Sequence, residues 1–551
     1  MEIPGLRIRS PFTIPSGIVT TVPTVIARIA RDIPEIGFLT TKTISVEPRE
    51  GYREPILYEY YPGCFVNAVG LANPGAKNFL QAMQPLLPLH ENKPLLVSIM
   101  GTNVEEFLQC ALILNPIADA FELNLSCPHV KGAGQSIGSD PNAVRSIIGL
   151  LKERIDKPVI PKLSPNLGDI PGMARVCKEA GADGLCLINT VGPGTAADVD
   201  GNPILTNTAG GLSGAGILPV GIKAVREAAA AVDLPIIAMG GITCADDVLA
   251  YKQAGASYFG VGSALADMTT PQIVSFFGEL GRPLRQRPEQ LSPPKCIATA
   301  SRTTYVKTTV TRNEPFGPDL FKLSLERGPA CNPGRFFFLR LPGIGEKPFS
   351  PAGDLEPTYF VRAVGPFTRA LQSLKPGDSI FMRGPYGQGF PEPASGSRIV
   401  LVAGGTGAAP ILMALARWKE LAVRAFFGFS APIESWFQDE IRGSRSVSSS
   451  GSLHPDVRVV IDSPDHVGEV VRALEEDVVS NPALYTDCRV FVCGPDPMMR
   501  ATVKALENRV PRGKIFPARE DIMRCGIGIC GSCGTGTGLR SCVDGPVMCA
   551  E

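Results

Sequence analysis

The segment IIAMGGI (residues 236–242), followed after one helix-like stretch by YFGVGSA (258–264), decides the fold of this chain. Each segment is a short apolar run that ends in glycine just before a helical pattern. In barrels built of alternating strands and helices, the last two strands end in this way. At these two ends, backbone N–H groups and a helix N-terminus bind a phosphate. A single Gly-Gly pair could be only a tight turn. Two such ends, joined by GGLSG (210–214), predict a phosphorylated cofactor such as FMN.

Six further apolar, β-rich runs precede these two, with helix-like segments between them. The runs are FTIPSG (12–17), GFLTTKT (37–43), LLVSIMG (95–101), AFELNLSC (120–127), VIPKLSP (159–165) and GLCLINT (184–190). The clearest helical patterns cover residues 24–33, 143–155, 220–232 and 245–255. Eight strands with eight crossovers in about 270 residues fit a (β/α)8 TIM barrel better than an open doubly wound sheet. We therefore expect the chemistry at the carboxyl ends of the strands.

Polar, cationic and glycine residues stand at these expected strand ends. They are Ser16, Lys42, Thr43, Asn124, Cys127, Lys162, Asn189, Thr190, Gly240, Gly241, Gly262 and Ser263. Burying a polar group costs free energy unless the group finds a hydrogen-bonding partner. One of them alone could be a helix cap or a satisfied buried group, but this many on one face indicate a site.

The composition limits which classes of protein and which kinds of partner are plausible for this chain. A chain of 551 residues with 44% hydrophobic and 19% charged residues predicts roughly two to four globular domains. Lys+Arg and Asp+Glu both number 53, so charge gives no reason to expect nucleic acid or an anionic membrane as partner. No signal core and no apolar run of about 18 residues is found, so we expect a cytoplasmic protein. There, clustered cysteines indicate metal or catalysis. Scattered ones such as Cys110, Cys177 and Cys244 are expected to be small buried apolar residues.

The second half of the chain has a different pattern. The stretch GRPLRQRPEQLSPPK (281–295), rich in proline and charge, predicts a domain boundary. Short β-rich runs follow at 303–312, 320–326, 335–341, 358–364 and 379–387, as in an antiparallel barrel. From about residue 398 an α/β pattern returns with a strand, a Gly-rich turn and a helix. Such a turn lets a dinucleotide approach backbone amides.

Four cysteines near the end of the chain have the spacing of an iron–sulfur site. Cys525-x4-Cys530-x2-Cys533, with Cys542 further on, matches the plant-type [2Fe–2S] pattern. Glycines at 526, 528 and 531 permit the tight turns that direct N–H groups at the sulfurs. The alternative is a zinc site, which prefers two well-separated cysteine pairs. Cys549 is then a spare thiol.

The ordered motifs of the first 285 residues or so resemble the catalytic subunit of class 1B dihydroorotate dehydrogenases. They are TKT (41–43), NAVGLANPG (67–75), ELNLSCP (122–128), INTVGPG (188–194), GGLSG (210–214) and GGI…VGSAL (240–265). The resemblance implies FMN contacts from Ser16, Lys42, Thr43, Asn124, Lys162, Ile188, Gly214, Gly240, Gly241, Gly262 and Ser263. It implies substrate contacts from Lys42, Asn67, Gly70, Leu71, Asn124, His129, Asn189 and Thr190.

The same resemblance implies that Cys127, Lys42 and Lys162 are the catalytic residues. Cys127 matches the base that removes the proton from C5 of dihydroorotate while the hydride leaves C6 for the flavin. A free cysteine has a pKa of about 8.5, so neutral pH leaves a small thiolate fraction that a site can raise. Lys162 would stabilise the anionic reduced ring as a fixed cation.

One residue departs from the family pattern. The usual SCPN is SCPH here, with His129 in place of asparagine, and this form is similar to the flavin domain of dihydropyrimidine dehydrogenases, which act on uracil and thymine. The loop NAVGL favours orotate, because in the dihydroorotate family Lys42 and the amides of that loop receive a carboxylate that uracil lacks. We therefore place orotate first.

The second half resembles the electron-transfer subunit of the same enzymes. The segments KPFS (347–350), FVRAVGPFT (360–368) and GPYGQGF (384–390) are similar to its FAD-binding segments, although Lys347 stands where arginine is usual. The implied FAD contacts are Lys347, Pro348, Phe349, Ser350, Phe360, Val361, Arg362 and Thr368. GGTGAAP and VFVCGPDPMM (490–499) are similar to the nicotinamide domain of ferredoxin reductases, with contacts from Gly404, Gly405, Thr406 and Gly407.

The resulting hypothesis is an NAD+-linked enzyme that oxidises (S)-dihydroorotate to orotate in pyrimidine biosynthesis. Electrons would pass from FMN through the [2Fe–2S] cluster and FAD to NAD+, in a fused chain that forms a homodimer through its barrel. Whether this relay runs within one chain or between chains stays open. Two alternatives remain: a dihydropyrimidine dehydrogenase and a non-catalytic electron-transfer flavoprotein. The expected domains are 1–285 (FMN barrel), 286–296 (linker), 297–395 (FAD barrel), 396–512 (NAD domain) and 513–551 (cluster domain).

Overall fold

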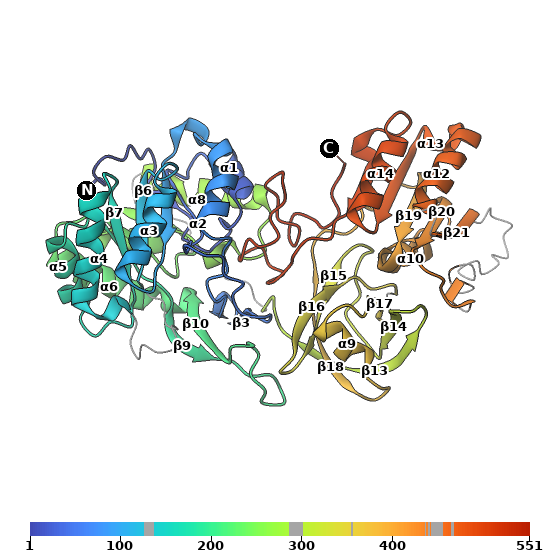
Figure 1. The fold of residues 1–551 in the computed structure, drawn as a ribbon, viewed down its shortest axis with the longest axis horizontal. Helices are drawn as coiled ribbons and strands as arrows, with labels where there is room; N and C mark the ends of the chain where they lie inside the picture. Colours follow the sequence, from blue (N-terminus) through green and yellow to red (C-terminus); the bar gives the residue numbers. More distant parts are fainter. Residues whose placement is uncertain are drawn as a thin grey trace. The chain divides into compact units, whose positions relative to one another are not determined.

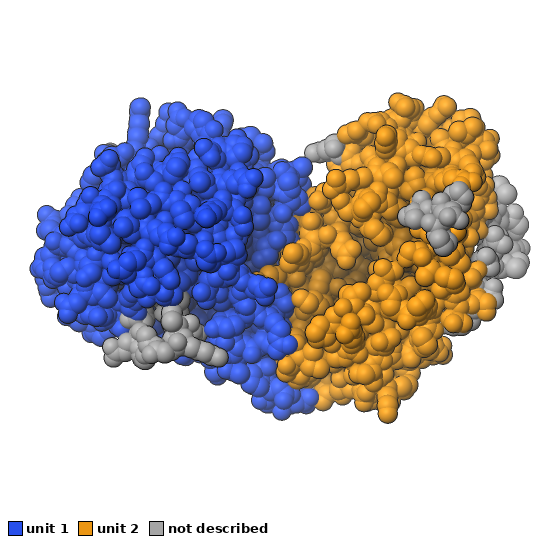
Figure 2. Space-filling model, in the orientation of Figure 1, with its two compact units in different colours: residues 1–304, 527–540 blue, residues 305–526, 541–551 orange. Residues whose placement is uncertain are grey.

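The computed structural model describes residues 1–125, 137–285, 301–353, 356–435, 437–438, 441, 456–463 and 468–550. The chain divides into two compact units (Figure 2). The first unit holds residues 1–304 and 527–540, and the second holds 305–526 and 541–551. The segment 527–540 therefore belongs to the N-terminal unit, although it is separated from it by more than two hundred residues of sequence.

The first unit is an eight-stranded parallel barrel, as the sequence predicts. Its strands are ordered β1-β12-β11-β8-β7-β6-β5-β2, and the parallel bridge between Phe12 and Ile36 lies at the seam beside β2. Each of the eight predicted runs supplies one strand: β1 (Phe12–Thr13), β2 (Leu39–Thr40), β5 (Leu95–Ile99), β6 (Ala120–Asn124), β7 (Val159–Leu163), β8 (Leu185–Leu187), β11 (Ile236–Met239) and β12 (Tyr258–Gly260). All five residues of β5 and of β7 are buried, because barrel strands are covered on both faces.

Helices surround this barrel (Figure 1). They are α1 (Pro23–Asp32), α2 (Ala76–Met83), α3 (Val104–Leu114), α4 (Pro141–Arg154), α5 (Ile170–Glu179), α6 (Leu218–Ala231), α7 (Ala245–Gln253) and α8 (Thr270–Arg285). Short 3₁₀ turns are η1 (Gln84–Leu86), η2 (His90–Asn92), η3 (Ile137–Ser139), η4 (Ala215–Ile217) and η5 (Ser263–Leu265). Helix α4 is typical: Asp140 caps its N-terminus, and Val144, Ile147, Ile148 and Leu151 form its buried stripe.

A four-stranded antiparallel sheet, absent from the sequence prediction, is added to the barrel. Its order is β3-β4-β10-β9, with β3 (Leu57–Tyr61), β4 (Cys64–Asn67), β9 (Val191–Thr195) and β10 (Ala209–Gly214). All five residues of GGLSG thus lie in strand β10, and the last of them, Gly214, also precedes η4. The pairing of Leu212 with Val66 joins distant parts of the chain, which local sequence patterns cannot reveal.

The second unit begins with the antiparallel sheet that the sequence predicts. Its order is β16-β15-β18-β13-β14-β17. The elements are β13 (Val306–Pro315), β14 (Leu320–Leu325), β15 (Phe336–Leu341), β16 (Gly345–Phe349), β17 (Thr358–Arg362), α9 (Pro366–Gln372) and β18 (Ser379–Tyr386). Phe337, Leu339, Tyr359 and Ile380 are among the residues of its hydrophobic core.

A five-stranded parallel sheet, β21-β20-β19-β22-β23, completes this unit. Its elements are β19 (Arg398–Gly404), η7 (Gly405–Gly407), α10 (Ala408–Arg417), β20 (Ala422–Phe429), β21 (Asp456–Ile461), α12 (Glu469–Ser480), α13 (Pro482–Tyr485), β22 (Cys488–Cys493), α14 (Asp496–Leu506), η8 (Arg512–Lys514) and β23 (Ile515–Ala518). Within the ranges described above, no helix combines the length and apolar character needed to cross a membrane.

Candidate active site

A cavity of about 600 Å³ opens at the carboxyl ends of the barrel strands. It is lined by every described barrel residue that the sequence predicts for the site: Ser16, Lys42, Thr43, Asn67, Gly70, Leu71, Asn124, Lys162, Ile188, Asn189, Thr190, Gly214, Gly240, Gly241, Gly262 and Ser263. Cys127 and His129 lie outside the described residues, so their placement and roles stay predictions. The strand-end pattern and the family resemblance together predicted which residues meet at this cavity, and the individual contacts with ligands remain predictions.

Two glycines that line the cavity pack so closely against neighbouring residues that a side chain would not fit there without strain. Gly240 and Gly241 have φ values of +115° and +80°. A Cβ on Gly241 would lie 2.7 Å from Cβ of Leu218, the first residue of α6, and one on Gly240 would lie 3.1 Å from the side chain of Ile188. The bare backbone beside the start of a helix fits the phosphate of FMN.

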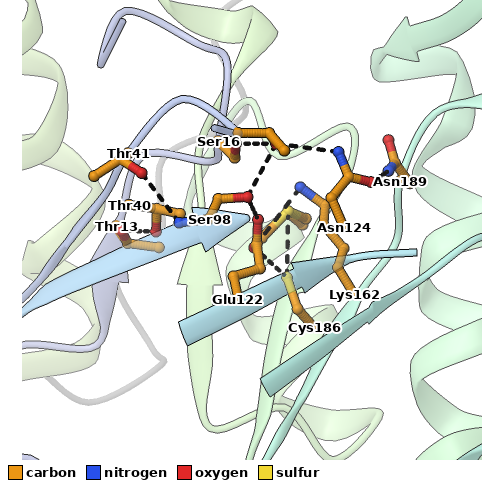
Figure 3. A network of polar contacts seen from close by, with 12 residues as sticks. Thr13, Ser16, Thr40, Thr41, Ser98, Glu122, Asn124, Lys162, Cys186 and Asn189 are labelled. Atoms are coloured by element: carbon orange, nitrogen blue, oxygen red, sulfur yellow. Dashed lines mark hydrogen bonds and ion pairs between the residues drawn. The ribbon is translucent and has the colours of Figure 1, made fainter. Parts of the chain in front are cut away.

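A hydrogen-bonded polar network organises the next part of the site (Figure 3). Oγ1 of Thr43 lies 3.0 Å from Oγ of Ser16 and 3.0 Å from Oγ of Ser98, and it accepts a bond of 3.1 Å from Nδ2 of Asn124. Oδ1 of Asn124 in turn accepts a bond of 3.2 Å from Nδ2 of Asn189. Five side chains, each in or just after a different barrel strand, thus hold one another in place, which pre-organises the amides for a ligand.

A buried ion pair lies beneath this network. Nζ of Lys162 is 3.9 Å from Oε2 of Glu122, and their side chains are 6% and 1% exposed. Glu122 also accepts hydrogen bonds from Ser98 (2.8 Å) and from the thiol of Cys186 (3.3 Å). Sequence reasoning missed Glu122, although a carboxylate inside the apolar strand AFELN was a usable signal. A buried carboxylate with these partners can balance a cation that faces the cavity.

Four described cysteines of the barrel have raised pKa values and so little thiolate at neutral pH. Burial, together with the nearby Glu122 carboxylate, raises the pKa of Cys186 well above its ordinary value. Burial raises the pKa of Cys110 and of Cys177 to about 12. The expectation that these two are small buried residues is confirmed, whereas Cys244 is half-buried at the start of α7. None of these four thiols has the lowered pKa of a nucleophile.

The NAVGL loop is held in an unusual conformation at the cavity. Gly70 has a φ of +72° and Leu71 a φ of +56°, a region that non-glycine residues seldom occupy. Asn73 stabilises the turn, because its Nδ2 donates to the carbonyl of Leu71 (2.8 Å) and its Oδ1 accepts from the amide of Gly75 (2.9 Å). Strain of this kind concentrates at ligand-binding sites.

A segment from the end of the chain reaches the mouth of the cavity. Ile529 and Cys530 line it beside the barrel residues. The amide of Val19 donates to the carbonyl of Ile529 (2.7 Å), and Oγ1 of Thr21 donates to the carbonyl of Cys530 (2.8 Å). A predicted cluster ligand therefore lines the barrel cavity of its own chain.

The four predicted cluster cysteines are all buried. Cys530 and Cys533 belong to the first unit, and Cys525 and Cys542 belong to the second. Gly526, Gly528 and Gly531 have positive φ, as the predicted turns require. Among the residues that the structure describes, no three His, Cys, Asp or Glu side chains form a group set to hold a metal ion. Four buried thiols on glycine-rich backbone fit a [2Fe–2S] cluster by donor type, and their ligand roles stay predictions.

The predicted FAD residues lie on β16, β17 and the start of α9. Phe360 and Val361 are buried in hydrophobic cores, so only their main chains are available to a cofactor. Oγ1 of Thr368 accepts bonds from the amides of Val364 (3.1 Å) and Gly365 (3.0 Å), which caps α9. Nε of Arg362 is 3.3 Å from a carboxylate oxygen of Asp319.

The two predicted nicotinamide turns lie against each other. A Cβ on Gly407 would lie 2.3 Å from the carbonyl oxygen of Cys493, and one on Gly494 would lie 3.0 Å from the amide nitrogen of Gly404. Only glycine allows two backbones to approach this closely. The carboxyl ends of β19 and β22 thus form one glycine-lined edge, where an open parallel sheet binds its ligands.

Comparison with protein families finds two matches in this chain. Residues 1–280 match the family described as dihydroorotate dehydrogenase. Residues 520–551 match the iron–sulfur cluster binding domain of dihydroorotate dehydrogenase B. The matched regions contain the barrel and all four predicted cluster cysteines.

The barrel half is also similar to individual curated proteins. The dihydroorotate dehydrogenase B (NAD(+)) catalytic subunit of Pyrococcus abyssi is 41% identical over 262 residues, which is 47% of this chain and 85% of that subunit. The subunits of the same name from Pyrococcus horikoshii and Thermococcus kodakarensis are 42% and 41% identical, over 47% and 48% of this chain and 84% and 86% of their own lengths.

Proposed function

The chain belongs to the dihydroorotate dehydrogenase family, and on this premise we propose that it oxidises (S)-dihydroorotate to orotate in pyrimidine biosynthesis, with NAD+ as the final electron acceptor. The observation that carries the proposal is the convergence of Lys42, Asn67, Asn124 and Asn189 on one cavity. Amide side chains can pair with the alternating C=O and N–H groups of a dihydropyrimidine ring. Lys42 and the amides of Gly70 and Leu71 would receive the carboxylate.

The proton leaves C5 of the substrate in this proposal, and Cys127 is its acceptor. A general base typically contributes about 10²–10⁴-fold to the rate. FMN, when bound, accepts the hydride that leaves C6. Lys162 would hold a positive charge at the cofactor, oriented by its buried pair with Glu122, and Gly240 and Gly241 would hold the phosphate.

The second unit and the segment 520–551 would carry the electrons away. Cys525, Cys530, Cys533 and Cys542 would hold a [2Fe–2S] cluster, which transfers single electrons when bound. FAD would occupy the site of Lys347 to Ser350 and of Phe360 to Arg362 with Thr368, and NAD+ the turn from Gly404 to Gly407. The proposal includes a cytoplasmic location and a homodimer formed through the barrel.

Anaerobic absorbance of the fully loaded protein tests the proposal. Dihydroorotate should bleach flavin and cluster, NAD+ should restore the absorbance, and dihydrouracil in a parallel sample should have no effect. Bleaching by dihydrouracil instead would make this chain a dihydropyrimidine dehydrogenase and His129 its specificity residue. Failure of both substrates to bleach would contradict the proposal and leave the substrate of the barrel open.

A further inference from the structure

Arg383, on β18 of the second unit, is a fully buried cation next to a cluster cysteine. Its Nη1 donates to the backbone carbonyl of Cys525 at 2.8 Å and to the hydroxyl of Tyr386 at 3.0 Å. Its Nε and Nη2 donate to Glu346 at 2.9 and 2.5 Å. The side chains of Arg383 and Glu346 are both 0% exposed. The guanidinium therefore distributes its bonds between a carboxylate on one side and the cluster segment on the other.

The guanidinium of Arg383 is packed between an aromatic ring and the backbone next to Cys525. Its guanidinium lies over the ring of Phe338, 4.0 Å from the ring centre. A Cβ on Gly526 would lie 2.9 Å from the Phe338 ring and 3.3 Å from Nη1 of Arg383. Glu346 is held from its other side by the hydroxyl of Tyr305 (2.6 Å). Arg383 is therefore in contact with Phe338, Glu346 and the backbone of Cys525 at the same time.

Stability alone does not account for this arrangement. A fully desolvated ion pair is often no better for stability than apolar residues of the same shape. A planar guanidinium does offer something that an apolar side chain lacks, because its fixed donors can hold a carboxylate and a distant carbonyl at once. It also places a permanent positive charge beside the predicted position of an anionic cluster.

We propose that Arg383, oriented by Glu346, is a positioning residue for the iron–sulfur cluster: it fixes the backbone of Cys525 and raises the reduction potential of the cluster. The proposal rests on the proposed function, since it takes Cys525 as a cluster ligand. Arg383 reaches the cluster only through Cys525 and its own charge. Hydrogen bonds and net charge near the sulfurs are the means by which proteins set such potentials.

The experiment compares Arg383→Gln and Glu346→Gln in the full chain carrying its cofactors. Arg383→Gln leaves an extra negative charge beside the cluster, so the potential should fall. Glu346→Gln leaves an extra positive charge, so the potential should rise. Both variants should lose iron to a chelator faster than the parent, by about 10–100-fold for Arg383→Gln, as is usual when a residue supporting a metal ligand is removed.

Arg424→Gln is the matched control. Arg424 forms a comparable pair with the buried Asp477 (3.0 Å), but in the parallel sheet of the same unit. This change should leave the cluster potential and the rate of iron loss at parental values. NADH-dependent ferricyanide reduction, which needs FAD but not the cluster, checks the folding of each variant. If Arg383→Gln does not fold, Arg383→Lys takes its place. It keeps the charge and loses the planar fork, so faster iron loss with an almost unchanged potential would then support the proposal, and parental iron loss would overturn it.

Potentials shifted in opposite directions would support the proposal, because a merely structural pair would not produce opposite signs. Parental potentials and rates of iron loss in both variants would overturn it while leaving the proposed function intact. A parent protein that binds no iron and sulfide would overturn the cluster assignment itself, and this proposal with it.

Discussion

The two units of the chain each bury an ion pair, and the two pairs differ in what they leave available. In the barrel, Lys162 stands 3.9 Å from Glu122 and lines an open cavity. In the second unit, Arg383 donates two hydrogen bonds, of 2.9 and 2.5 Å, to Glu346, and its side chain is fully buried. A cation that lines a cavity and is only loosely paired can interact with a bound ligand directly. A cation that is fully buried can act only through its charge and through the backbone to which it is hydrogen-bonded. The two proposals therefore give buried charge a different role in each unit.

The largest effect is expected on the barrel side of this comparison, at Cys127. Cys127→Ala should lower turnover at least about a hundredfold with FMN still bound, because the general base is lost while the glycine cradle remains. Single-turnover bleaching of the flavin by dihydroorotate measures this step, and Cys177→Ala is the control for loss of a buried thiol. Parental turnover in Cys127→Ala would remove this residue from the mechanism.

The second-largest effect is expected for Lys162→Gln. This change should lower kcat by about 10²–10³-fold, because it removes a fixed cation from the reacting site. It should also destabilise the barrel by about 3–5 kcal/mol, since Glu122 stays buried without its partner. Urea unfolding and steady-state kinetics separate the two effects.

The double variant Lys162→Gln with Glu122→Gln sharpens this test. It should regain most of the stability and none of the turnover. If turnover returned along with stability, the role of Lys162 would be structural, and the contrast with Arg383 would disappear.

A smaller effect is expected at the glycine cradle. Gly241→Ala places a Cβ 2.7 Å from that of Leu218 and forces alanine to a φ of +80°, which costs about 1–2 kcal/mol. Fluorescence titration of the apoprotein should show about tenfold weaker FMN binding. Gly149→Ala is the control, because nothing lies within 4 Å of a Cβ placed on this helical glycine.

The smallest effect is expected at Thr368 in the second unit. Thr368→Ala should destabilise this unit by about 1 kcal/mol, because two amides at the start of α9 lose their acceptor. Retention of FAD, followed by its absorbance after gel filtration, distinguishes this capping role from the predicted contact with the cofactor. Loss of FAD without loss of stability would support the contact and contradict the capping role.

Much of the barrel site was predictable because its information is local. Strand ends are visible in sequence as polar residues after apolar runs, and parallel barrel topology brings all such ends to one face. Ser16, Lys42, Asn124 and Lys162 were assembled correctly in this way. Glu122 was not predicted, because residues inside an apolar strand are expected to belong to the core and its partner Lys162 lies on the neighbouring strand.

Local sequence patterns were enough to predict the eight parallel strands, the polar residues at their ends, the glycine-rich turns and the cysteine spacing, because period and turn chemistry act over short ranges of chain. Only the tertiary structure decided that GGLSG enters an antiparallel sheet, that the segment of Cys530 lies at the mouth of the barrel cavity, and that Arg383 holds Cys525. Each of these depends on contacts between residues more than a hundred positions apart. Packing and burial select such contacts, and no local pattern encodes them.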